Sequence, residues 1–133
     1  MKYVPIDKNI LDRIQSIKEN PSDFSFFDCN KKFVNIELFM LFLAFGFKMN
    51  EKEDAGPFTP SIPIARFEEI HALNRIIVHG IAYNDTNDTK LLVDFEEAIK
   101  IANQYAKGGM NLFFSMPLSE QERVISLHLG KMY

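Results

Sequence analysis

Apolar residues recur every three or four positions in several stretches of the chain, which is the spacing of an amphipathic helix. These stretches predict helices over residues 7–19, 68–83, 91–107 and from Ser119 to about Lys131. Asp7 suits the capping position of the first helix, and Ser119 with Glu122 has the spacing of a capping box at the start of the last. The pattern predicts a mainly α fold of about five helices.

The remaining predicted helix, residues 35–47, is apolar on every side. A helix of this kind is normally surrounded by protein, so it is either the central helix of the domain or a helix shared with another chain. The chain has 13 phenylalanines and no tryptophan, and Phe39, Phe42 and Phe45 lie in this helix. These rings fit a core or a contact surface. We expect them to contribute to self-association or to binding of a partner.

The segments between the predicted helices are polar or rich in proline. Residues 48–63 hold three of the six prolines and predict a long loop, with Phe58 as a ring exposed for partner docking. Residues 21–34 show no period and predict a connecting segment. Short strands are predicted only near 64–67 and 110–115.

The length of 133 residues fits a single domain spanning 1–133. The net charge of −3 provides no field that attracts phosphates, which argues against direct nucleic-acid binding. The only cysteine, Cys29, excludes an internal disulfide and fits a reducing compartment. The N-terminus lacks the features of a signal peptide, and no apolar run approaches the ~20 residues that span a bilayer. We therefore expect a cytoplasmic protein without a membrane segment.

Catalytic and cofactor signatures are sparse. His71 and His79 stand eight residues apart, about 12 Å along a helix, which is too far to share a metal ion. Gly108-Gly109 follows a predicted helix and therefore predicts a helix stop instead of a phosphate-binding loop. We expect no metal, no cofactor and no catalytic residue. An alternative is a small nuclease-type enzyme or toxin with a site centred on His71 or His79, next to Arg75 and Glu68; a DNA-binding helical domain is a third possibility.

Two segments carry a family resemblance. Residues 38–48 (LFMLFLAFGFK) resemble the "LFLLAAxLGYxN" stretch of small DNA phosphorothioation-associated proteins, the Dnd system-associated protein 4 family. Residues 101–109 (IANQYAKGG) resemble that family's "IAEEYANGG", and residues 74–82 stand where it has an "LIRAIAL"-like helix. The likeness extends over about 33–114, but the family's basic loop is replaced here by the acidic segment 48–54.

The resemblance implies a small accessory component that is encoded beside bacterial DNA-modification or antiphage defence machinery. It supplies no catalytic residues. Together with the sparse chemistry, it leads us to expect a non-enzymatic accessory or adaptor subunit. Its expected partner is a larger defence protein, an ATPase or a nuclease, or a second copy of the chain.

Overall fold

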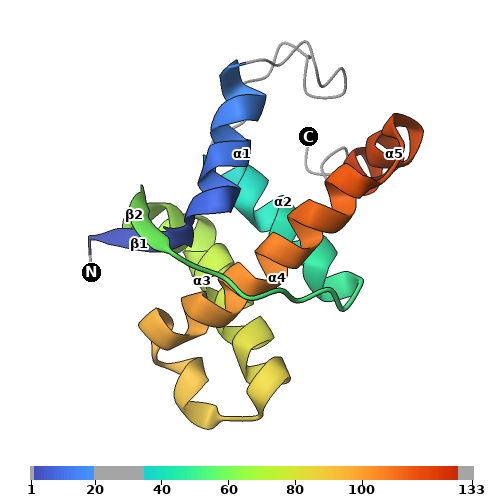
Figure 1. Cartoon of the computed structure of the whole chain (residues 1–133). Coiled ribbons are helices and arrows are strands. Elements are labelled where there is room, and N and C mark those ends of the chain that lie inside the picture. The colour runs from blue at the N-terminus through green and yellow to red at the C-terminus, as the bar shows by residue number, and fades with distance from the viewer. Residues whose placement is uncertain (1, 20–34, 129–133) are drawn as a thin grey trace.

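The computed structural model describes residues 2–19 and 35–128, and these form five α-helices, one 3-10 helix and a two-stranded sheet (Figure 1). The elements are β1 (Tyr3–Asp7), α1 (Lys8–Glu19), α2 (Asn35–Lys48), β2 (Phe58–Pro63), α3 (Ile64–Thr86), η2 (Thr89–Leu92), α4 (Phe95–Ser115) and α5 (Leu118–His128). The prediction of a mainly α fold is confirmed. The predicted connection at 21–34 and the predicted helix end near Lys131 lie outside the described residues.

Helices α2 and α4 cross at the centre of the molecule, and glycine allows their backbones to touch (Figure 1). A Cβ atom on Gly46 would collide with the Tyr105 carbonyl, and one on Gly109 would collide with the Phe42 carbonyl. Gly108 faces the Glu51 carbonyl in the same way. The predicted helix stop at Gly108-Gly109 is therefore wrong. Both glycines lie inside α4, where they permit close packing.

Helix α2 is the central helix and is covered by other elements of the chain. Phe39 and Phe42 are 0% exposed and Phe45 is 5% exposed. The ring of Phe42 lies 6.1 Å from Phe113, and the ring of Phe39 lies 6.2 Å from Phe67, centroid to centroid. Because these three phenylalanines of α2 are buried in their own chain, they are not available as a contact surface in this structure.

The sheet is an antiparallel pair in which Val4 lies opposite Ile62 and Asp7 lies opposite Phe58. The last six residues of the predicted loop 48–63 therefore form a strand. Its prolines are tolerated because a two-stranded sheet consists only of edge strands, which do not need every amide donor. The predicted strands at 64–67 and 110–115 are wrong, since both segments are helical.

Three helix boundaries differ from the sequence prediction. Helix α4 begins at Phe95, after Asp94 accepts a hydrogen bond from the Glu97 amide at 3.2 Å, and the residues before it form η2. Helix α3 spans Ile64–Thr86, so it extends beyond the predicted range 68–83 at both ends. Helix α5 begins at Leu118, so Ser119 lies inside its first turn and not at its cap. The Pro117 carbonyl accepts the amides of Glu120 and Gln121 in that turn.

Helix α3 is interrupted near its start. Ile70, His71 and Ala72 have φ angles of 54°, 58° and 60°, in the left-handed region. This region costs a residue with a Cβ atom roughly 1–2 kcal/mol, and it is most unusual for a β-branched residue such as isoleucine. The kink separates a short first segment from the straight helix that begins at Leu73.

Candidate functional site

The straight part of α3 has apolar residues on two opposite sides. Its inner side buries Val78, Ile81 and Ala82 against the core. Its outer side carries Leu73, Ile76 and Ile77, which are 50%, 60% and 36% exposed. With Gly80 these residues follow the spacing i, i+3, i+4, i+7, which places them on one face of the helix. We call Leu73, Ile76, Ile77 and Gly80 the outer face of α3.

The helical spacing of Ile70, Leu73, Ile76, Ile77 and Ile81 predicts core positions, and for the outer face of α3 this prediction is wrong. Of the five aliphatic residues expected in the core of this helix, only Ile81 is buried. Ile70, at the kink, is 78% exposed. Within residues 2–19 and 35–128 this side of the helix stays partly exposed, and a contiguous exposed apolar patch is a candidate contact site.

The outer face also carries no charge. The ionised side chains of the straight segment are Arg75 and Asp85, and both have partners within the chain. Arg75 pairs with Glu68, with 3.0 Å between Nη1 and Oε1. An apolar, uncharged helix face suits contact with another protein far better than contact with phosphates.

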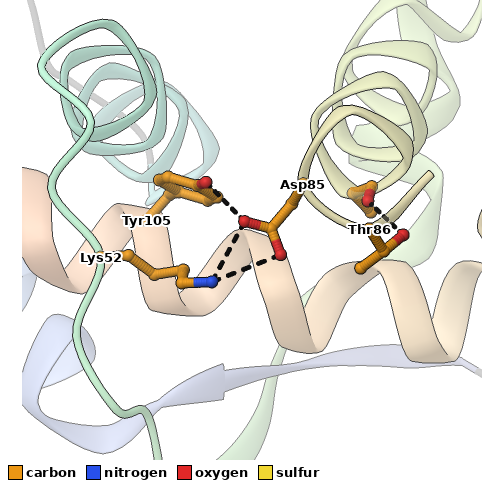
Figure 2. Close-up of polar contacts among 5 residues, drawn as sticks. Lys52, Asp85, Thr86 and Tyr105 are labelled. Carbon is orange, nitrogen blue, oxygen red and sulfur yellow. Dashed lines mark hydrogen bonds and ion pairs between the residues drawn. The ribbon is translucent and has the colours of Figure 1, made fainter.

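Asp85, at the end of α3, joins two other parts of the chain in a polar cluster (Figure 2). The Tyr105 hydroxyl on α4 donates to Asp85 at 2.6 Å, and the Lys52 ammonium lies 3.1 Å from the same oxygen, Oδ1. Thr86 beside it donates to the Ala82 carbonyl at 2.9 Å. The Asp85 cluster fixes the end of α3 and the segment 49–57 against α4.

The cluster shifts the pKa values of its members. Burial opposes ionisation of Asp85, but the hydrogen bonds from Tyr105 and Lys52 and the Lys52 charge outweigh it, so the pKa of Asp85 is lowered. Burial, reinforced by the hydrogen bond to Asp85 and by its negative charge, raises the pKa of Tyr105 to about 12. At neutral pH the cluster therefore contains an ionised Asp85 and a protonated Tyr105.

Replacement of Tyr105 by Phe is expected to lower the free energy of unfolding by about 1.5 kcal/mol at pH 7, because a hydrogen bond to a charged group is lost. The pKa of Tyr105 is higher in the folded chain than the usual 10, so its contribution is complete below pH 10 and is lost as the pH rises toward 12. Urea unfolding at pH 7 and pH 11 measures this. The difference between wild type and Tyr105→Phe should shrink at pH 11, and a constant difference would contradict the assignment.

The residues of the alternative enzymatic hypothesis are only partly brought together. The Arg75 Nε atom donates to Nε2 of His79 at 3.4 Å, and Nδ1 of His79 lies 2.7 Å from the Leu91 carbonyl. Since a carbonyl only accepts, Nδ1 carries the proton and donates it to Leu91. Both ring nitrogens of the buried His79 are thus engaged within the protein. His71 is exposed at the left-handed kink and takes no part in this arrangement.

A hollow of about 520 Å³ lies beside the contacts of Arg75. Its lining residues are Ile64, Glu68, Arg75, Val93, Asp94, Phe95 and Glu96. The Arg75 guanidinium stacks 5.1 Å from the centre of the Phe95 ring and is neutralised by Glu68. The hollow thus has no unpaired arginine and no histidine, serine or cysteine in its wall. Across residues 2–19 and 35–128, no three histidine, cysteine or carboxylate side chains are grouped to hold a metal ion.

Phe58, the fourth residue predicted for partner binding, lies at the start of β2 and is 38% exposed. It is a single ring beside Gly56, whereas the outer face of α3 offers three adjacent aliphatic side chains. Within the described part of the chain, none of the helices is both long and apolar enough to cross a bilayer.

Comparison with known proteins adds no relative: no protein-family model, no curated protein and no solved structure matches this chain.

Proposed function

We propose that this protein is a non-enzymatic accessory subunit that acts through protein–protein contacts, with the outer face of α3 as its main contact surface. The observation that carries the proposal is the exposure of Leu73, Ile76 and Ile77 on a helix whose opposite side is already buried. A helix that is apolar on both sides is normally covered by protein on both sides. Phe58 adds a smaller, separate contact point.

The biological setting that we propose comes from the family resemblance. The chain would serve a bacterial antiphage defence or DNA-modification complex in the cytoplasm, beside a larger ATPase or nuclease. Two features favour an adaptor over a catalyst. The ring nitrogens of His79 are bonded to Arg75 and Leu91, and Arg75 is paired with Glu68. These contacts stabilise the packing of α3 against its neighbours. They leave none of these groups free to act as a base on a substrate.

Loss of the apolar face should abolish partner binding without unfolding the chain. We expect the tagged wild-type protein, expressed in its source bacterium, to co-purify with a larger protein in fixed stoichiometry. Ile76→Glu should reduce this recovery at least tenfold, because a charge is placed in an apolar contact. Ile76 is 60% exposed, so the free energy of unfolding should change by no more than about 0.5 kcal/mol.

Val93→Glu is the matched control. Val93 is 79% exposed and apolar but lies outside the outer face of α3, so this variant should retain the partner. Equal recovery of the partner with wild type and Ile76→Glu would contradict the proposal. The partner identified in this way is then purified. Calorimetry measures its affinity for the wild type, for Ile76→Glu and for Val93→Glu.

Hydrolysis assays test the enzymatic alternative. Incubation with DNA, RNA and nucleoside triphosphates, with and without divalent metal ions, should release no product. His79→Asn is the informative variant, because its amide nitrogen can keep the bond to the Leu91 carbonyl. Hydrolysis by the wild type that disappears in folded His79→Asn would establish the nuclease-type alternative in place of the adaptor.

A further inference from the structure

The kink near the start of α3 sets the fold against the local sequence. Ile70, His71 and Ala72 are all left-handed, and none of them is glycine or asparagine, the residues that accept this conformation most readily. Residues 64–79 contain neither glycine nor proline, and their periodicity predicts an unbroken helix from residue 68. Backbone strain of this kind gathers at switch regions and binding sites. We call residues 69–72 the hinge.

Contacts across the hinge hold the kink. The side-chain amide of Asn74 donates to the Arg66 carbonyl at 3.4 Å, and the Arg75 guanidinium pairs with Glu68 at 3.0 Å. Eight residues of straight helix span ~12 Å, so Asn74 reaches the Arg66 carbonyl only because the chain bends between them. Phe67 is 0% exposed and anchors the segment before the hinge in the core. These contacts offset the strain of the left-handed residues.

A straight α3 would have a longer outer face. Ile70 stands three residues before Leu73 and seven before Ile77, which is the spacing of one helix face. The left-handed residues between Ile70 and Leu73 take Ile70 out of this register. Ile70 is 78% exposed at the kink. Straightening would release the strain and add Ile70 to the outer face as a fourth aliphatic side chain.

We propose that the hinge is a conformational switch, which keeps the outer face of α3 one turn short in the free chain and straightens when the partner binds. This inference rests on the proposed function, because it concerns the regulation of the same face. A partner shifts such an equilibrium by its preference for one form, and here Ile70 provides the difference between the two forms. The free chain then binds with an affinity that is reduced by the small fraction of straight molecules.

The distance between two spin labels measures the switch in the isolated chain. The labels are attached to Ala65→Cys and Thr86→Cys in a Cys29→Ser background, and both labelled positions are exposed and lie outside the outer face of α3. In a straight helix the 21 residues between them span ~32 Å. In the kinked chain residue 66 is held beside Asn74, only 12 residues from Thr86, so the labels should lie about 10 Å closer.

Two pairs of substitutions should move this distance in opposite directions. Glu68→Ala with Asn74→Ala removes both contacts across the hinge, so a population near ~32 Å should appear. His71→Gly with Ala72→Gly should give only the shorter distance, because glycine accepts the left-handed conformation freely and is a poor helix former. Relief of strain should also raise the thermal midpoint of this glycine pair by a few degrees. The same distances in all three proteins, or a lowered midpoint of the glycine pair, would overturn the switch.

The partner that is purified with the wild type provides the second test. The glycine pair should bind it at least tenfold more weakly by calorimetry, although it keeps every aliphatic side chain of the outer face and also Ile70. The labelled chain should lengthen to ~32 Å when it is bound. A bound chain that keeps the shorter distance, or a glycine pair that binds as tightly as the wild type, would overturn the switch. Neither result would affect the proposed function, which Ile76→Glu tests separately.

Discussion

Gly46→Ala is expected to lower the free energy of unfolding by about 3 kcal/mol, at the upper end of the usual cost of overpacking a core. The added methyl group would collide with the Tyr105 carbonyl and would lie 2.9 Å from the Gly109 amide nitrogen. Both obstacles are backbone atoms, so no side-chain rotation can make room. Helices α2 and α4 would have to separate, and the phenylalanine contacts between them would loosen.

Gly80→Ala is the matched control for this substitution. The same methyl group at Gly80 meets open space, so this variant should raise the free energy of unfolding by about 0.5–1 kcal/mol. Urea unfolding, at a protein concentration low enough to keep the chain monomeric, measures the free energies of unfolding of both variants. Equal and small effects at the two glycines would show that α2 and α4 do not cross at Gly46.

Asp7→Ala is expected to cost about 3 kcal/mol, because one buried carboxylate serves three partners. Asp7 is 0% exposed and accepts the Ile10 amide at 3.1 Å and the Gly56 amide at 2.7 Å. The Lys107 ammonium lies 3.4 Å from Oδ2. The carboxylate thus caps α1, holds the segment before β2 and pairs with α4. Its removal leaves two amides and one ammonium without their acceptor.

Two further variants separate these contributions. Asp7→Asn keeps an acceptor oxygen for the cap but loses the charge, so its loss of stability should be intermediate. Asp12→Ala, which removes an exposed aspartate of α1, should change stability by no more than about 0.5 kcal/mol. Chemical unfolding at pH 7 gives all three values. A cost for Asp7→Ala as small as that for Asp12→Ala would contradict the buried role of this carboxylate.

The sequence was most informative where one local pattern had one physical outcome. Residues 35–47 are apolar on every side, and they form the buried central helix α2. The cap at Asp7 could also be predicted, since a carboxylate at that position has a local partner, the Ile10 amide. Its bonds to Gly56 and Lys107 join residues far apart in the chain and leave no local signal.

Prediction failed where one residue type serves two purposes. Gly108-Gly109 has the composition of a helix stop, yet these glycines continue α4 because α2 and the segment after it press against them. The same ambiguity hid the main candidate contact surface. Leu73, Ile76 and Ile77 have the spacing expected of core residues, and only the packing of Val78, Ile81 and Ala82 shows which side of α3 faces inward.

Hydroxyl-radical footprinting of the protein recovered from its native cells without denaturation tests most directly whether the outer face of α3 is a protein contact. In the isolated chain Ile76 is 60% exposed and Val93 is 79% exposed, so both should react readily in a dilute monomer. In the native assembly we predict that Leu73, Ile76 and Ile77 are protected while Val93 still reacts. Reaction of Ile76 in the native sample at the rate of the dilute monomer would contradict the central claim.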